Sequence, residues 1–137
     1  MIYDNLKPLE IGQTFEYDFK LDKFIYLKFL EISKDNNQIH TNNDFAISHG
    51  FDSKIMHGNI LNIYLSFFIG TVLPIKNIII ISQNIFFKNP LYLNDIIKLY
   101  SEIISIHESV NIFELKFSFN KVSKICVGNG KIKLRTF

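Results

Sequence analysis

The chain has 137 residues, 47% of them hydrophobic and 20% charged, which is the composition of one globular domain with a continuous core and not of a disordered chain. Its formal net charge of +2 is small and its lysines are scattered, so we expect no DNA or RNA partner. The single cysteine, Cys126, excludes an internal disulfide and lacks the spacing of a zinc site, so we expect it inside a strand as a small apolar residue.

No targeting or membrane-spanning segment is expected. Residues 1–13 contain no basic stretch followed by an apolar run, which a secretory signal would need. The longest apolar segment, residues 63–75, includes a serine, a glycine, a threonine and a proline, and is shorter than the ~20 residues of a bilayer span. We therefore expect a cytoplasmic protein without a membrane partner.

The first third of the chain predicts a strand and then a helix. After a turn signal at residues 10–13, residues 14–19 alternate aromatic and polar side chains, the period of a strand with one buried face. Asp22 is placed to cap a helix over residues 24–33. The apolar residues of this helix, expected mostly along one side, are Phe24, Tyr26, Leu27, Leu30 and Ile32.

Two further helices are predicted in the middle of the chain. Thr41 and Asp44 have the spacing of a capping box before a short helix that Gly50 would end. The segment from Gly58 to about Val72 shows no β-alternation and is apolar nearly all round, which predicts a mostly buried helix ended by Pro74.

One narrow stripe on the long helix carries its small and polar residues. These are Asn59, Asn62, Ser66 and Gly70. The stripe could face a cavity or a closely packed strand, and a pocket role for Asn62 is no better supported than tight helix–sheet packing.

The remainder of the chain has strand character. The predicted strands cover residues 77–87, 95–107, 111–121 and 131–137. The turn signals between them are Asn89-Pro90, Asn94-Asp95 and Gly128-Asn129-Gly130. Helices early and strands late indicate an α+β fold, with an antiparallel sheet around the long helix, in a single domain spanning residues 1–137.

Several ordered motifs resemble one enzyme family. They are Asp35-Asn36-Asn37-Gln38-Ile39-His40, Asp44-Phe45-Ala46, Gly50-Phe51, Ile55-Met56-His57-Gly58, Leu61, Ser66 and the run SQNIFFKNPLYLNDII. Together they are similar to the MaoC-like, (R)-specific enoyl-CoA hydratase family, whose pattern is Asp-x-Asn-Pro-x-His, a short helix, and a His-Gly-Met-Leu helix start. The resemblance runs over nearly the whole chain without large gaps.

This resemblance implies a hotdog fold, in which a curved antiparallel sheet wraps a long central helix, and a homodimer or higher homo-oligomer. It also implies that Asp35 and His40 form the catalytic dyad and that the backbone N–H of Gly58 holds the thioester oxygen. Ser66 matches a serine lining the same site. Further candidate substrate-binding residues are Asn37, Asn59 and Asn62.

The implied reaction fits these residue types. Hydration of an enoyl thioester needs a base to hold water over the β-carbon, a proton for the α-carbon and stabilisation of the enolate oxygen. Asp35 and His40 could supply the base and the proton through one shared water. The helix start at Gly58 could stabilise the enolate oxygen, because its free N–H groups and dipole favour an oxyanion. One such hydrogen bond is worth roughly 3 kcal/mol in the transition state. We expect no metal or cofactor beyond CoA or acyl-carrier phosphopantetheine as the substrate carrier.

Four residues depart from the family pattern. Gln38 stands where the family has proline, and Asn59 replaces an apolar residue next to the oxyanion position. Lys34 and Asn94 replace glycines. None of these changes removes a catalytic atom, so they bear on the substrate more than on the reaction.

Simpler explanations exist for the histidines. Asp35 and His40 alone could be a helix-capping acid and a hydrogen-bonded structural histidine. We expect His57 to hold a loop by a side-chain hydrogen bond, and His49 and His107 to lie at the surface or in dimer contacts. A metal site from His40, His49 and His57 has no recognised ligand spacing.

Three other functions are compatible with the same motifs. The first is an acyl-thioester hydrolase, in which Asp35 would activate water against the carbonyl carbon. The second is a dehydratase of a small molecule that is not a fatty acyl chain, as the polar Gln38 and Asn59 suggest. The third is a non-catalytic acyl-thioester-binding subunit, because a fold alone does not determine activity.

Overall fold

A computed structural model describes residues 9–137, so residues 1–8, which make up most of the segment searched for a secretory signal, lie outside the described part. One antiparallel sheet has the strand order β1-β4-β5-β6-β2, and β3 pairs with β6. The strands are β1 (Thr14–Lys20), β2 (Ile78–Gln83), β3 (Phe86–Phe87), β4 (Ile96–His107), β5 (Ile112–Lys121) and β6 (Cys126–Thr136). The helices are α1 (Lys23–Ser33), α2 (Gln38–Thr41), α3 (Asn43–Ser48), α4 (Ile60–Phe67), the π-helix η1 (Phe68–Val72) and the 3₁₀-helix η2 (Glu108–Val110).

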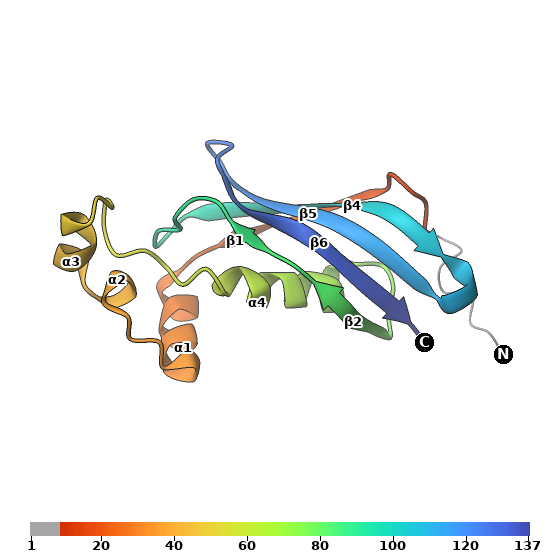
Figure 1. The fold of residues 1–137 in the computed structure, drawn as a ribbon, viewed down its shortest axis with the longest axis horizontal. Helices are drawn as coiled ribbons and strands as arrows, with labels where there is room; N and C mark the ends of the chain where they lie inside the picture. The colour runs from red at the N-terminus through yellow and green to blue at the C-terminus, as the bar shows by residue number, and fades with distance from the viewer. Residues whose placement is uncertain (1–8) are drawn as a thin grey trace.

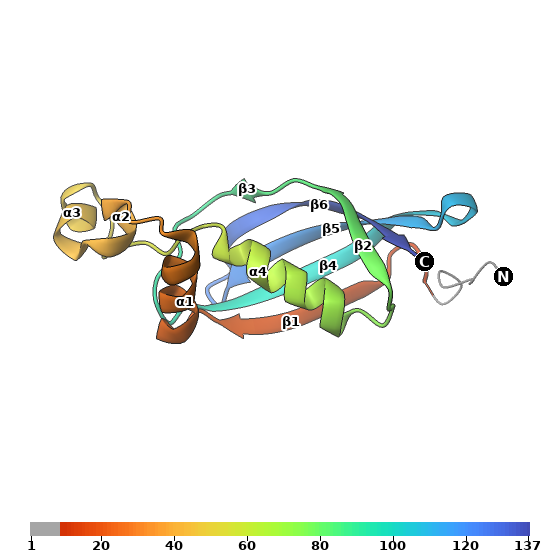
Figure 2. The ribbon, with the colours of Figure 1, turned by 90° about the horizontal axis from the view of Figure 1, so that it is seen from below.

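The sheet curves over α4, which lies along its concave face (Figures 1 and 2). The helices α1, α2 and α3 extend beyond one end of the sheet, and the N-terminal start of α4 points toward them. This arrangement confirms the predicted α+β architecture of a sheet wrapped around one long helix.

The core lies between the sheet and α4. On β5, alternate residues point inward and are at most 4% exposed: Phe113, Leu115, Phe117 and Phe119. They face the buried side of α4, formed by Ile60, Leu61, Tyr64 and Leu65. The period-two pattern predicted for this strand is therefore confirmed, and burial of these apolar side chains is the main force that fixes α4 on the sheet.

Two predicted strand limits differ from the structure. The expected continuous run 77–87 is broken at residues 84–85 into β2 and β3, and the last strand begins at Cys126 and not at residue 131. Cys126 is therefore the first residue of a strand, half-buried, and not an interior residue. The turn before β6 lies at residues 122–125, where Lys124 has a φ of 66°.

The glycines at 128 and 130 mark close contacts inside β6, so the turn predicted there is wrong. A Cβ on Gly128 would come within 2.9 Å of the Leu61 side chain, and one on Gly130 would collide with the backbone carbonyl of Asn84. Glycine is needed because α4 and the break between β2 and β3 both press against this strand. The turn predicted at Asn94-Asp95 is confirmed, and Asn94 has the left-handed φ of 71° that suits asparagine, whereas Asn89-Pro90 lies at a bend between β3 and β4.

Helix α1 forms as predicted but buries less than its pattern suggests. Asp22 caps it by accepting a hydrogen bond from the Ile25 N–H (3.0 Å). Only Tyr26 is fully buried, whereas Phe24 is 69% and Ile32 80% exposed. The reason is that α1 lies at the end of the sheet and packs on the core along one side only, with Ile25, Phe29 and Leu30 half-buried beside Tyr26.

The predicted capping box is wrong, although the short helix exists. Thr41 belongs to the single turn α2, and Asn42 caps α3 by accepting from the Phe45 N–H (3.0 Å). Asparagine at that position satisfies the free N–H directly, so no reciprocal pair with Asp44 is needed. Gly50 follows the helix with a φ of 91°, as expected for a helix stop.

The polar stripe of the long helix is divided, because Asn59 lines a cleft and the other three members do not line that cleft. Ser66 and Gly70 are exposed, and Asn62 reaches the end of β2, where its side-chain oxygen accepts from Gln83 (2.9 Å). Gly58 and Asn59 precede the regular helix as a turn. Across residues 9–137, the helices are all too short or too polar to cross a bilayer.

Candidate active site

A cleft of about 380 Å³ opens where the 35–40 loop, the start of α4 and the segment after β3 meet. Its polar lining includes Asp35, His40, Gly58 and Asn59. Its walls are apolar, with Phe29 and Phe51 among them. A mostly apolar cleft with a few converging polar groups is the usual form of a small-molecule site.

Local hydrogen bonds fix the loop that carries Asp35. Lys34 ends α1 in the left-handed conformation (φ 56°), where the family has glycine, and the Asp35 N–H then donates to Ser33 Oγ (3.2 Å). Asn37 caps α2 by accepting from the Ile39 N–H (3.3 Å). Gln38 is therefore the first residue of α2, a position that favours proline, and a glutamine there lacks the fixed φ of proline.

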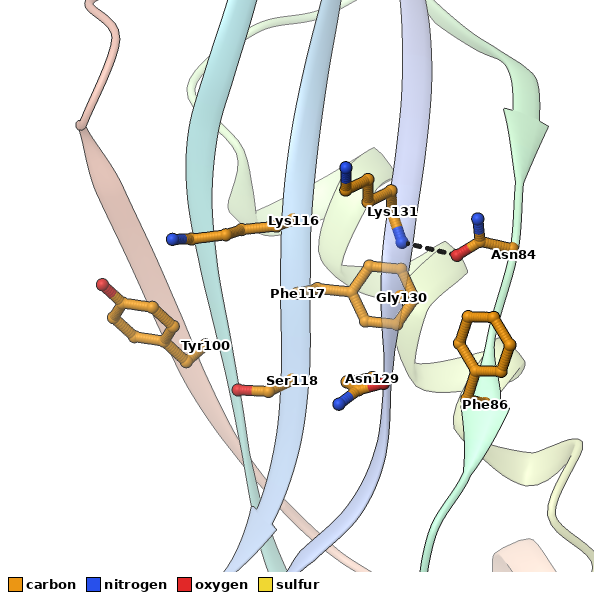
Figure 3. A pocket seen from close by; sticks show the side chains of 9 residues that line it. All are labelled: Asn84, Phe86, Tyr100, Lys116, Phe117, Ser118, Asn129, Gly130 and Lys131. Carbon is orange, nitrogen blue, oxygen red and sulfur yellow. Dashed lines mark hydrogen bonds between the residues drawn. The ribbon is translucent and has the colours of Figure 1, made fainter.

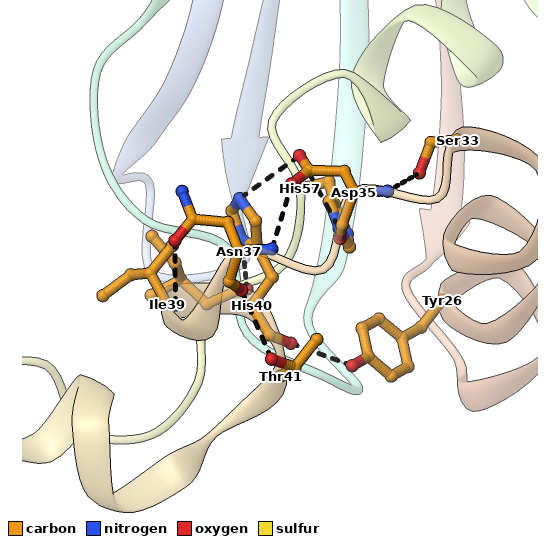
Figure 4. Close-up of polar contacts among 9 residues, drawn as sticks. Tyr26, Ser33, Asp35, Asn37, Ile39, His40, Thr41 and His57 are labelled. Carbon is orange, nitrogen blue, oxygen red and sulfur yellow. Dashed lines mark hydrogen bonds and ion pairs between the residues drawn. The ribbon is translucent and has the colours of Figure 1, made fainter.

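His40 is held with one ring nitrogen directed at Asp35. Its Nδ1 lies 2.9 Å from the Ile55 carbonyl oxygen, which can only accept, so Nδ1 carries a proton. The Tyr26 hydroxyl donates to the His40 carbonyl (2.8 Å) and anchors the backbone (Figure 4). In the neutral ring, Nε2 is then a free acceptor, 3.9 Å from Asp35 Oδ2.

His57 links both members of the dyad. Its Nε2–H donates to the Asp35 carbonyl (2.9 Å), and its ring stacks on His40 with centroids 4.1 Å apart. The side chain is 2% exposed, and burial lowers the pKa of His57 below its ordinary value of 6.5, with the nearby His40 ring acting in the same direction. His57 is thus a neutral ring that holds the Asp35 backbone, as the sequence indicated.

The spacing of the dyad suits one bridging water. A separation of 3.9 Å between Asp35 Oδ2 and His40 Nε2 is too long for a direct hydrogen bond, but an oxygen about 2.8 Å from each atom contacts both. The carboxylate and the neutral Nε2 both accept, so such a water donates both of its protons to them. This polarises the water oxygen as a nucleophile.

The start of α4 supplies hydrogen-bond donors to the same cleft. Within residues 9–137, the backbone N–H groups of Gly58 and Asn59 have no protein acceptor, since the first turn is closed by Ile60 and Leu61. A Cβ on Gly58 would lie 2.9 Å from the Phe87 ring, so only glycine leaves room there. Free N–H groups at a helix N-terminus favour a negatively charged oxygen.

The other candidate residues are not all gathered at this cleft. Asn59 lines it, and its Oδ1 accepts from Asn62 (2.9 Å), which lies behind it. Asn37 acts as a helix cap, and Ser66 lies exposed two turns along α4, outside the residues that line the cleft.

The histidine set considered for a metal does not assemble. His49 is exposed and stacks on Phe45, whereas Asp35, His40 and His57 bring one potential ligand atom each within 4.8 Å of one another. His57 Nε2 carries a proton in its bond to the Asp35 carbonyl, so this nitrogen is not free to bind an ion. The absence of a metal stays a prediction. His107 is exposed at the end of β4.

The sequence did not indicate two residues that support the site but have no proposed role in the reaction. Tyr26 fixes the His40 backbone from α1, and Phe87 covers Gly58 from β3. Neither position carries a local signal, because both contacts join segments far apart in the chain.

The known proteins that resemble this chain include hydratases and dehydratases. No family model matches the chain. It is 29% identical over 102 residues to an (R)-specific enoyl-CoA hydratase of Aeromonas caviae, covering 74% of this chain and 76% of the relative. It is 31% identical over 97 residues to a 3-hydroxybutyryl-CoA dehydratase of Methylorubrum extorquens, covering 71% of this chain but only 62% of the relative.

A solved structure of an (R)-hydratase from A. caviae superimposes with a TM-score of 0.88 at 24% identity, over 96% of this chain and 99% of the other. The fold is therefore the hotdog fold that hydratases and dehydratases share. These relatives and structural neighbours are (R)-specific enoyl-CoA hydratases and MaoC-like dehydratases, so the resemblance noted in the sequence is confirmed.

Proposed function

We propose that this protein is a hydro-lyase that adds water to, or removes it from, the 2,3 double bond of an enoyl thioester, with Asp35 and His40 as its dyad. The observation that carries the proposal is that Asp35 Oδ2 and His40 Nε2 lie 3.9 Å apart in the cleft that receives the free N–H groups at the start of α4. Base and oxyanion donors are thus available to one substrate.

The steps follow from these positions. The water oxygen bonds to the β-carbon while its proton passes to the dyad, and the electron pair of the double bond moves toward the thioester oxygen. The Gly58 N–H stabilises the resulting enolate, and the dyad then returns the proton to the α-carbon. Dehydration is the same sequence reversed. These steps need no metal or organic cofactor, and CoA or phosphopantetheine serves as the carrier.

A homodimer is part of the proposal. The edge strand β2 exposes three consecutive isoleucines, Ile79, Ile80 and Ile81, at 44–45% each. Such an apolar, uncharged edge invites association, and natural proteins cover it. A second copy paired at this edge would cover it, and sedimentation of the purified protein should then give twice the mass of the chain. A monomer at micromolar concentration would refute this part. A cytoplasmic location stays a prediction.

The direct test mixes purified protein with crotonyl-CoA and follows the loss of the conjugated enoyl absorbance. We expect a decrease that depends on enzyme concentration, without release of free thiol. Release of free thiol would instead identify the thioesterase alternative, in which Asp35 directs water at the carbonyl carbon. Binding without either change would identify a non-catalytic subunit.

A further inference from the structure

A second hollow, a groove of about 470 Å³, lies on the outer face of the sheet, away from α4. It spans β4, β5 and β6 and is bounded by Asn84 and Phe86 at the β3 side (Figure 3). The hydration chemistry uses none of its residues.

The strand register arranges this groove in two rows. Tyr100, Ser118, Asn129 and Phe86 are successive cross-strand partners, so the first row has an aromatic ring at each end and polar groups between. Ser118 Oγ accepts from Asn120 (2.9 Å), which leaves its hydroxyl proton free to donate. The second row is Glu102, Lys116 and Lys131.

The second row carries uncompensated positive charge. Lys116 and Lys131 are directly opposite each other in the β5–β6 ladder, and like charges at such positions destabilise a sheet. Glu102 neutralises Lys116 at 3.0 Å. Within residues 9–137, Lys131 forms no ion pair. An anion bound beside Lys131 would remove this repulsion.

The groove adjoins the catalytic cleft through β3. Phe86 and Phe87 are neighbours on this strand, and their side chains point to opposite sides: Phe86 lines the groove, and Phe87 lies against Gly58 in the cleft. Lys88, at the cleft rim, places its Nζ 5.3 Å from the centroid of the Phe86 ring. A ligand leaving the cleft over β3 therefore meets a cation, an aromatic ring and then the lysine row.

We propose that this groove binds the phosphorylated adenosine of coenzyme A, with the thioester end of the same molecule in the cleft. The exposed face of Phe86 stacks the adenine, the Ser118 hydroxyl and Asn129 amide hydrogen-bond its edge, and Lys88 and Lys131 bind the phosphates. This inference rests on the proposed function, and it selects CoA over a carrier protein as the substrate carrier.

The test compares two thioesters that differ only in the nucleotide. With crotonyl-CoA, Lys131→Ala should raise KM about tenfold, as expected for one lost charged hydrogen bond, with kcat retained. With crotonyl-pantetheine, the same variant should behave like the parent. Phe86→Leu, which keeps an apolar side chain but loses the ring face, should show the same selectivity. The matched control is Lys133→Ala, because Lys133 lies on the same strand opposite Glu114 and outside the groove.

Other outcomes overturn the inference. Equal effects on both thioesters, or none on either, would show that the groove does not bind the nucleotide. An effect confined to crotonyl linked to an acyl carrier protein would assign the groove to that protein. If no thioester is hydrated, the proposed function fails, and nucleotide binding to the groove is then measured without turnover. Adenosine 3′,5′-bisphosphate should raise the melting temperature of the parent but not of Lys131→Ala, and no rise in the parent would refute the site.

Discussion

The sheet with α4 and the segment from residue 23 to residue 57 are stabilised in different ways. The first region holds nearly all of the core, whereas the second has four buried side chains: Tyr26, Ala46, Met56 and His57. The segment is instead held by hydrogen bonds to its backbone, from Tyr26 to the His40 carbonyl and from His57 to the Asp35 carbonyl. A few buried polar anchors thus position Asp35 and His40, while apolar burial stabilises the scaffold. Substitutions in the two regions should separate activity from stability.

The largest effect is expected at the dyad itself. Asp35→Asn and His40→Ala should each lower kcat by about 10²–10⁴-fold, the usual contribution of a general acid or base. The melting temperature of Asp35→Asn should change little, because Asp35 is half exposed and forms no direct hydrogen bond with His40. His40→Ala also loses the hydrogen bond to the Ile55 carbonyl, so a modest fall in its melting temperature is expected, and kcat is compared per folded molecule. The matched control is His49→Ala, since His49 is an exposed histidine of the same segment. Crotonyl-CoA turnover measures the effect, and a parent-like rate in both dyad variants would refute the assignment.

Substitutions in the core should lower stability and leave activity nearly unchanged. Phe113 lies on β5 and is 1% exposed. Its replacement by alanine should lower the unfolding free energy by about 3–5 kcal/mol. Turnover per folded molecule should stay within a few-fold of the parent, because the cleft lies at the opposite end of the sheet. Phe24→Ala, at a site 69% exposed on α1, should cost less than about 0.5 kcal/mol. Urea denaturation measures both values, and a large loss at Phe24 would show that α1 belongs to the core.

Substitutions of His57 should affect activity through the position of the Asp35 backbone. His57→Leu removes the donor to the Asp35 carbonyl and should lower kcat about tenfold, the value of one positioning hydrogen bond. His57→Gln, which keeps a nitrogen donor at similar reach, should restore most of this loss. Equal activity of the two variants would show that the hydrogen bond does not position the dyad.

The lowered pKa of His57 also predicts a pH dependence of stability. The folded protein holds His57 neutral, whereas the unfolded chain protonates it near pH 6.5. The unfolded state therefore binds more protons below this pH, so the unfolding free energy should fall as the pH decreases from 6.5 toward the folded pKa. His57→Gln should show a smaller fall over the same range. An unchanged slope would mean that another group titrates.

The sequence predicted that Asp35, His40 and Gly58 lie together, but it did not predict which residues surround them. Asp35, His40 and Gly58 are close in the chain. Their spacing limits where they can lie, and so do the start of α2 between Asp35 and His40 and the start of α4 next to Gly58. Contacts such as Phe87 on Gly58 join residues 29 positions apart and leave no local pattern. The turn predicted at Gly128 and Gly130 was wrong for a related reason. Glycine is typical of turns, but it is also required where two segments pack closely, and the sequence alone does not distinguish these two cases. Ser66, placed by resemblance, is exposed outside the cleft.

The smallest predicted effect compares two buried tyrosine hydroxyls that make equivalent bonds in the two regions. Tyr26 donates to the His40 carbonyl at 2.8 Å, and Tyr64, on α4, donates to the Lys20 carbonyl at 3.2 Å. Phenylalanine at either position should cost about 1 kcal/mol of unfolding free energy, because one buried carbonyl loses its donor. Only Tyr26→Phe should also lower kcat, by about two- to fivefold, since it alone frees the backbone that carries a dyad residue. If Tyr64→Phe lowers kcat to the same extent, the dyad is positioned by the rigidity of the whole domain and not by the local anchors of its segment.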